Sequence, residues 1–216
     1  MPGYVLDLRQ AASASLATVG GKALNLGRLA AADFPVPPGF CLTTDGYLKA
    51  APPELDAITA RLDGAGPDGT RLEKAALSDG DRGLPDDERN RLARRAREAV
   101  AAAPVPPDVE AAVREAYAAL GSGPVAVRSS ATAEDLPFAS FAGQQDSFVD
   151  VTGADAVVEA VRRCWASLWT DRAVAYRTTN GISHREVGLA VVLQQMVPAG
   201  TAGVLFTANP VTGTRT

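Results

Sequence analysis

Residues 125–150, VAVRSSATAEDLPFASFAGQQDSFVD, carry the most information about how this chain folds. The stretch begins with three small apolar residues, 125–127, placed between a Gly-Ser-Gly-Pro turn and two serines. An apolar run bounded by turn residues predicts a short buried strand that ends in polar residues. Further hydroxyls, two acids and an Ala-Gly turn follow before the chain returns to an extended segment. We therefore expect the end of this strand to form part of a phosphate-binding surface.

Arg128 directly follows the predicted strand and is the first candidate binding residue. Its guanidinium stays charged and presents a planar fork of donors, which suits bidentate binding of phosphate oxygens. Ser129, Ser130 and Thr132 would add neutral donors. Gly143 would let a backbone N–H approach a ligand closely, because no side chain stands in the way.

A purely structural interpretation of the same residues stays open. Arg128 could form a surface ion pair with Glu134 or Asp135, while the serines cap a turn. Taken alone, the segment supports both interpretations equally.

The composition is that of an apolar, mildly acidic globular chain. Its 216 residues are 46% hydrophobic, which is enough to bury one large core or two lobes. The net charge of −4 includes no basic excess, so nucleic acid and anionic membranes are not expected as main partners. Any phosphate ligand must therefore be held by a local cluster of residues.

The cysteines and the N-terminus point to a cytoplasmic protein. Cys41 and Cys164 have neither CxxC spacing nor a nearby histidine cluster, so a structural zinc site and a disulfide framework are not expected. The N-terminus lacks the pattern of a signal peptide, and no apolar run approaches 18 residues. We expect reduced thiols and no membrane insertion.

Periodicity predicts the remaining elements. Strands are expected at 4–8, 40–43, 187–197 and 203–207, and helices from about residue 22, at 87–102, at 107–120 and around 157–169. Residues 51–88 are rich in Pro, Gly, Asp and Ala, which predicts loops and at most a short helix. We expect this stretch to be peripheral and the most mobile part of the chain.

Lys22 follows two glycines at the predicted start of a helix. It does not belong to a Walker A loop, which would require Gly at position 16 and Ser or Thr at position 23, where this chain has Leu16 and Ala23. An ammonium beside the free N–H groups of a helix N-terminus still suits an anion. A solvated surface lysine is the open alternative.

Gln194 and Gln195 end the predicted apolar strand at 187–197, shortly before Pro198. Amides at the end of a buried strand could hydrogen-bond the edge of a purine. Alternatively, backbone groups or water satisfy both amides.

Four motifs follow one another in a fixed order along the chain. They are VGGKALNLGRLAAADFPVPPGFCLTTDGY (19–47), VAVRSSATAEDLPFASFAGQQDSFVDV (125–151), CWASLWTDRAVAYR (164–177) and GVLFTANPVTG (203–213). Together they resemble the N-terminal ATP-binding region shared by phosphoenolpyruvate synthase, pyruvate phosphate dikinase and rifampicin phosphotransferase. The resemblance spans nearly the whole chain, is weakest over 51–105, and is closer to the synthase and rifampicin-type branches than to the dikinase.

The resemblance implies an α+β ATP-grasp fold, in which two lobes enclose the nucleotide. Residues 1–197 would form the first lobe, and 198–216 would be the incomplete start of the second. Magnesium ligands would belong to the missing part of that second lobe. The family also carries a phosphorylated histidine on a swivelling domain, whose motif does not match His184; we expect His184 to be a solvated loop residue.

The resemblance also implies roles for five residues of this chain. Lys22 and Arg128 would be the catalytic cations that bind the ATP phosphates, Gly143 and Ser147 would line the phosphate pocket, and Gln194 would lie at the hinge near adenine. In the family, the β-phosphate of ATP passes to the carrier histidine and then to pyruvate or to an antibiotic hydroxyl.

Two functions from different classes follow. The chain is either the ATP-binding part of a dikinase-type phosphotransferase that needs a second lobe and a carrier domain, or a non-catalytic nucleotide-binding or regulatory remnant of that fold. The final phosphate acceptor is chosen by domains outside these 216 residues.

Overall fold

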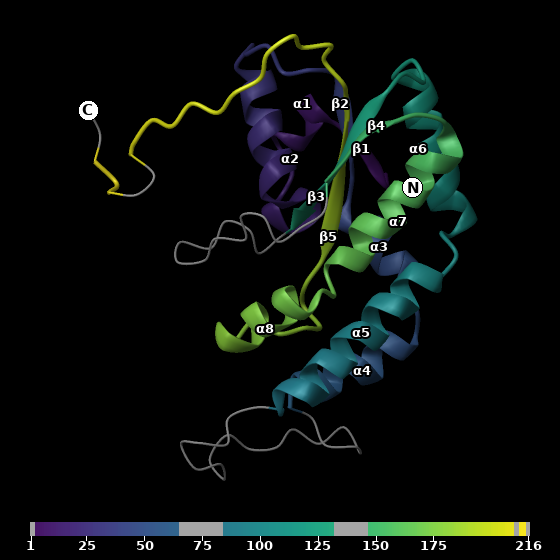
Figure 1. Cartoon of the computed structure of the whole chain (residues 1–216). Helices are drawn as coiled ribbons and strands as arrows, with labels where there is room; N and C mark the ends of the chain where they lie inside the picture. Colours follow the sequence, from purple (N-terminus) through teal and green to yellow (C-terminus); the bar gives the residue numbers. More distant parts are fainter. Residues whose placement is uncertain (1–2, 65–83, 132–146, 210–211, 215–216) are drawn as a thin grey trace.

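A single five-stranded antiparallel sheet organises the chain (Figure 1). The computed structural model describes residues 3–64, 84–131, 147–209 and 212–214. The strands run in the order β1-β2-β5-β3-β4 across the sheet. Their bounds are β1 Val5–Asp7, β2 Gly39–Leu42, β3 Val125–Ala131, β4 Ser147–Val151 and β5 Leu189–Gln195. With helices on both of its faces, the sheet makes this an α+β fold, as predicted.

Side chains that alternate along the central strands pack into two cores, one on each face of the sheet. Val125 and Val127 of β3 and Leu193 of β5 belong to a large core on one face. Cys41 of β2 and Val192 of β5 belong to a smaller core on the other. Successive side chains of a strand point to opposite faces. The face on which each of the other residues of these strands lies therefore follows from its position relative to these core residues.

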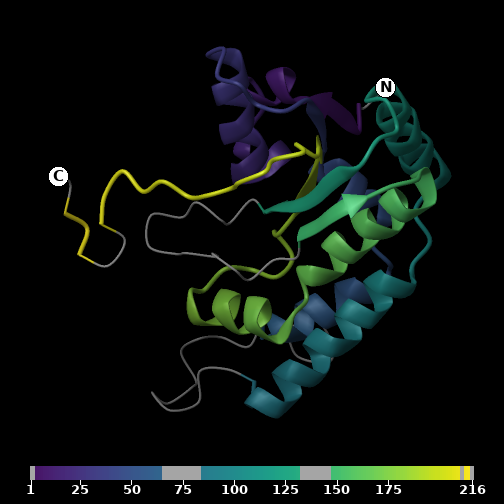
Figure 2. The ribbon, with the colours of Figure 1, turned by 45° about the horizontal axis from the view of Figure 1, so that its top comes forward.

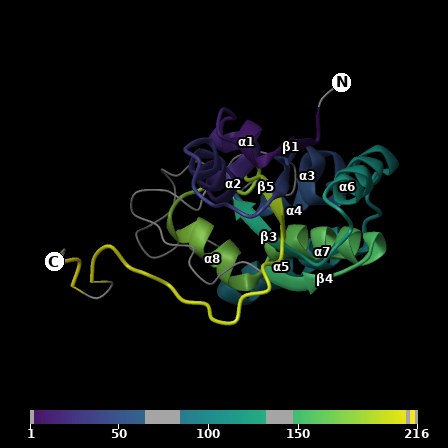
Figure 3. The ribbon, with the colours of Figure 1, turned by 90° about the horizontal axis from the view of Figure 1, so that it is seen from above.

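The helices divide unequally between these two faces, as the view from above shows (Figure 3). The smaller core is covered by α1 (Leu8–Ala11) and α2 (Leu16–Ala31), and we call this side of the sheet the α2 face. The large core is built with α3 (Thr44–Ala50), α4 (Glu54–Leu62), α5 (Asp86–Ala102), α6 (Pro107–Ala119), α7 (Ala154–Ser167) and α8 (Asp171–Thr179).

Most predicted elements are confirmed, with ends set by local hydrogen bonds. The strand predicted at 4–8 stops at Asp7, because the Asp7 carboxylate accepts from the Gln10 N–H (2.9 Å) and thereby caps α1. The helix predicted from residue 22 begins earlier, since Ser15 accepts from the Thr18 N–H (3.1 Å) and caps α2. The helices at 87–102, 107–120 and 157–169 and the strand at 187–197 also form.

Two expectations were wrong, and helices α1, α3 and α8 were not predicted. Helix α4 lies within 51–88 but is not peripheral, because Leu55, Ile58 and Leu62 are buried in the large core. No strand forms at 203–207, since no other described strand pairs with this segment, and Leu205 is 93% exposed. Residues 198–209 instead run away from the sheet (Figure 2).

Among the described residues, no helix is both long enough and apolar enough to cross a membrane.

Candidate functional site

Arg128 and Ser147 lie directly opposite each other on neighbouring strands. Arg128 pairs with Ser147 of β4 on one side and with Val192 of β5 on the other. Since Val192 belongs to the smaller core, all three side chains point to the α2 face. Arg128 is half-buried and Ser147 is exposed. The sheet thus brings together a guanidinium and a hydroxyl that are separated by 19 positions in the sequence.

The prediction that Arg128 stands at a strand end was wrong, because β3 continues to Ala131. Both edges of β3 are paired, and the ladder with β5 extends as far as Ala131 and Leu189. The longer strand also places Ser129 on the face of the large core, opposite to Arg128. Ser129 is therefore removed from the set of phosphate donors.

The glycine pair before Lys22 lies against β3, close to Arg128. Helix α2 is broken at Gly20, whose backbone has φ 70° and ψ 170°. The Ser130 hydroxyl donates to the Val19 carbonyl (2.8 Å) and accepts from the Ala23 N–H (3.1 Å). Lys22 consequently lies in the first turn of the helical segment that restarts after Gly20, where N–H groups and the helix dipole favour an anion.

Other predicted residues fall outside the described part of the chain. Gly143, Thr132 and both acids of the alternative interpretation, Glu134 and Asp135, lie within 132–146. Among the ion pairs formed between described residues, none involves Arg128.

Gln194 lies on the same face of the sheet as Arg128. It follows Val192, the residue of β5 that pairs with Arg128, by two positions. It is buried, and its side-chain amide donates to the Pro37 carbonyl (3.0 Å). The Gln195 amide likewise donates to the Leu120 carbonyl (2.7 Å). Both amides thus make the backbone hydrogen bonds that the structural alternative predicts, and contact of Gln194 with a base stays a prediction.

His184 is not solvated, which corrects the prediction from the sequence. Its side chain is buried at 3% exposure. The Arg177 Nε donates to His184 Nδ1 (3.0 Å), and Thr178 Oγ1 lies 3.3 Å from Nε2. Because Thr178 already donates its proton to the Val174 carbonyl, it must accept from Nε2–H. Nδ1 accepts from Arg177 and therefore carries no proton, so His184 is a neutral imidazole.

The surroundings of His184 disfavour its protonation. Burial, followed by the nearby Arg177 cation, lowers the pKa of His184 to about 4, while the Asp63 carboxylate opposes this shift. Burial also lowers the pKa of Arg177 to about 10. Asp63 lies at the end of α4 and accepts from the His184 N–H (2.8 Å) and from the Ser183 hydroxyl (2.8 Å). The cluster therefore ties α4, α8 and the segment before β5 together.

Acidification should weaken the fold through His184. The folded-state pKa of about 4 lies below the ordinary value of 6.5, so this stabilisation is complete above pH 6.5 and is lost as pH falls through 4. A lowering of this size corresponds to about 3 kcal/mol of unfolding free energy. His184 is the only histidine, so its imidazole resonance in an untagged protein reports the titration directly.

Denaturant unfolding between pH 7 and 4 measures the same effect. His184→Gln, which keeps an acceptor for Arg177 but does not titrate, should show a shallower pH dependence. An imidazole that titrates near pH 6.5 in the folded protein would contradict the buried cluster.

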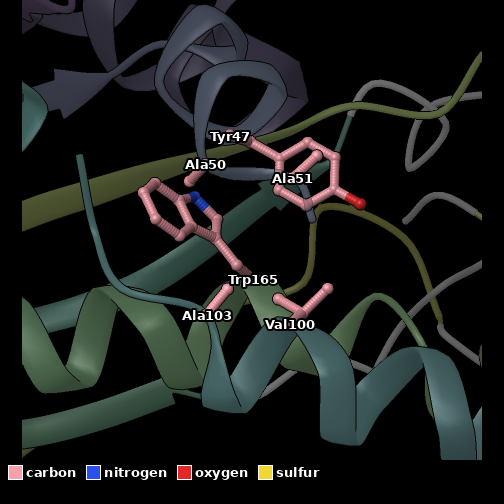
Figure 4. Close-up of a pocket in the computed structure, with 6 residues that line it drawn as sticks. All are labelled: Tyr47, Ala50, Ala51, Val100, Ala103 and Trp165. Carbon is pink, nitrogen blue, oxygen red and sulfur yellow. The ribbon is translucent and has the colours of Figure 1, made fainter. Parts of the chain in front are cut away.

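A crevice in the large core is not a ligand site. It is lined by Tyr47, Ala50, Ala51, Val100, Ala103 and Trp165, where α3, α5 and α7 meet (Figure 4). It has no room for a water molecule. The Trp165 and Tyr47 rings meet there edge-on at a centroid distance of 6.3 Å. These aromatic residues serve the core.

Neither thiol chemistry nor a resident metal is indicated in the described part of the chain. Cys41 and Cys164 form no disulfide and are both buried, and burial raises the pKa of Cys41 to about 12. No group of three or more His, Cys, Asp or Glu side chains among the described residues could hold a metal ion. These residues therefore do not fit a magnesium site of their own.

Comparison with known proteins identifies the family. Residues 16–216 match the family model described as pyruvate phosphate dikinase, AMP/ATP-binding domain. The chain is 46% identical over 99% of its length to a rifampicin phosphotransferase of Streptomyces sviceus and 42% identical over its full length to one of Bacillus subtilis. It is also 41% identical over 91% of its length to a probable phosphoenolpyruvate synthase of Pyrococcus abyssi.

The chain spans only about a quarter of each of these relatives, 23%, 23% and 27% respectively. The match nevertheless covers nearly the whole chain, including the break at Gly20, Lys22 and the strand that carries Arg128. The chain therefore belongs to the pyruvate phosphate dikinase AMP/ATP-binding domain family.

Proposed function

We propose that this chain is the first lobe of an ATP-grasp site in a dikinase-type phosphotransferase. Lys22 and Arg128 bind the phosphates of ATP, Ser147 and Gly143 line the same pocket, and Gln194 lies toward the base. A second lobe, of which 198–216 is the beginning, closes over the nucleotide and supplies the magnesium ligands. The lobe proper would be 1–197, in a cytoplasmic enzyme.

One observation carries this proposal: the Ser130 hydroxyl joins the Gly20–Lys22 turn to β3 only two residues from Arg128. Two segments that carry cations and lie about a hundred residues apart in the sequence thus meet on one face of the sheet. Positions 126 and 130 of β3 pair with Gln194 and Ala190 respectively. At about 3.3 Å per residue, Gln194 lies about 13 Å along the sheet from the Lys22 turn, so base and phosphate ends are separated.

The proposed reaction requires cations that are held at fixed positions around the phosphates. The β-phosphate of ATP passes to a histidine on another domain and from there to pyruvate or to an antibiotic hydroxyl. Charge on the transferred phosphoryl group is stabilised by fixed cations, and this is the work assigned to Lys22 and Arg128. Both are supplied by regular elements, since Arg128 lies on a strand paired on both edges and Lys22 on a helix whose inner face packs against the sheet.

Isothermal titration calorimetry with MgATP tests the binding claim. The measurement uses an extended protein, in which this chain is followed by the second lobe and the histidine-carrying domain, with the 216-residue chain as comparison. We expect saturable binding of ATP in the extended protein and weaker binding by the chain alone, because one wall of the site is then absent. An extended protein that binds no ATP would favour the non-catalytic remnant instead.

A further inference from the structure

The hydroxyl of Ser130 replaces a main-chain hydrogen bond inside α2. In an uninterrupted helix, the Ala23 N–H would donate to the Val19 carbonyl four residues earlier. Here both groups bind Ser130 Oγ instead, one as donor at 3.1 Å and the other as acceptor at 2.8 Å. A hydroxyl can do both at once, because it has one proton and two lone pairs. A side chain inserted into the helical ladder in this way produces a sharp break.

Water cannot take over this role without a rearrangement. Val19, Ala23 and Ser130 are each 0% exposed, so the insertion is sealed from solvent. The adjoining backbone is equally closed, since a Cβ built on Gly20 would lie 2.1 Å from the Ser130 carbonyl oxygen. The break is therefore held by one buried side chain at a point of direct backbone contact between α2 and β3.

We propose that Ser130 is a positioning residue, which fixes the Lys22 turn relative to Arg128 by holding α2 open at Gly20. Without the hydroxyl, either the Ala23 N–H stays unpaired and the Val19 carbonyl keeps only the long hydrogen bond from the Cys41 thiol (3.8 Å), or the two backbone groups bind each other. In the second case the helix straightens at Gly20, and the position of Lys22 relative to Arg128 changes. This inference rests on the proposed function for its catalytic consequence, but the break itself exists in the absence of nucleotide.

Ser129 provides a matched control. It is the neighbouring serine on the same strand, is buried at 1% exposure, and points to the opposite face of the sheet. Ser129→Ala removes the same atom from the same strand without touching α2. Ser130→Thr retains the hydroxyl and should preserve the break, whereas Ser130→Ala should lose it.

Amide hydrogen exchange tests the break without nucleotide. In Ser130→Ala, exchange at the Ala23 N–H should accelerate about tenfold or more relative to Val161 of α7 if this N–H stays unpaired. If it binds the Val19 carbonyl instead, exchange stays slow, but Gly20 becomes helical and its Cα chemical shift moves. Ser130→Thr and Ser129→Ala should leave both the ratio and the shift at their wild-type values. A Ser130→Ala variant with the wild-type ratio and the wild-type Gly20 shift would overturn the inference.

Kinetics of the extended protein test the positioning role. Ser130→Ala should lower kcat about a hundredfold, as a displacement of about 1 Å can do, while Ser129→Ala should not. If Ser130→Ala accelerates exchange but its kcat matches that of Ser129→Ala, then the break does not position Lys22 and the inference is wrong. A wild-type protein that binds no ATP refutes the proposed function instead, and the exchange measurement still decides whether Ser130 holds the break.

Discussion

Replacing Arg128 with alanine is expected to lower phosphoryl transfer from ATP at least about a thousandfold, while the protein stays folded. The loss follows from removing a fixed guanidinium that stabilises charge on the transferred group, an effect of about 10³-fold or more where such arginines act. The fold should persist, because β3 keeps its ladders to β4 and β5 through backbone groups, which the substitution does not change. The measurement is AMP release from ATP by the extended protein, with circular dichroism as the check on folding.

Two further variants sharpen this test. Arg128→Lys keeps the charge but loses the planar fork of donors, so it should recover only part of the activity. Arg94→Ala removes an exposed arginine from α5, on the other side of the sheet, and should leave activity unchanged. An Arg128→Ala enzyme with wild-type turnover would refute the assigned role.

Replacing Gly20 with alanine is expected to lower the free energy of unfolding by about 4 kcal/mol. The φ of 70° with ψ of 170° is a conformation that residues with a Cβ rarely adopt, at a cost of about 1–3 kcal/mol. In addition, the new Cβ would lie 2.1 Å from the Ser130 carbonyl oxygen, and overpacking against backbone costs about 1–3 kcal/mol. Thermal unfolding should shift down by about 8–16 °C.

Gly121 separates the two contributions to this loss. Its φ is +100°, but no atom lies within 4 Å of a Cβ built there. Gly121→Ala should therefore show the backbone strain alone, about 1–2 kcal/mol. If Gly20→Ala is no more destabilising than Gly121→Ala, the close approach of α2 to β3 is not present in solution.

The sequence by itself determined most of the elements and the candidate cations. Apolar periodicity located α5, α6 and α7, because each buries one face against the large core and so repeats at helical spacing. The glycine pair before Lys22 predicted a helix start, which coincides with the point where α2 restarts after its break at Gly20. The four ordered motifs led to the family that the comparison then showed.

Only the tertiary structure decided what depends on contacts between distant segments. Pairing with β4 and β5 prolonged β3 past its apolar residues and sent the adjacent Ser129 and Ser130 to opposite faces. His184 is buried because Arg177 and Asp63, the latter 121 residues away, converge on it. Conversely, residues 203–207 have a strand-like sequence but no partner strand in the described part of the chain. A local pattern records which residues prefer a helix or a strand, whereas partners brought from elsewhere determine where an element ends and which side chains meet.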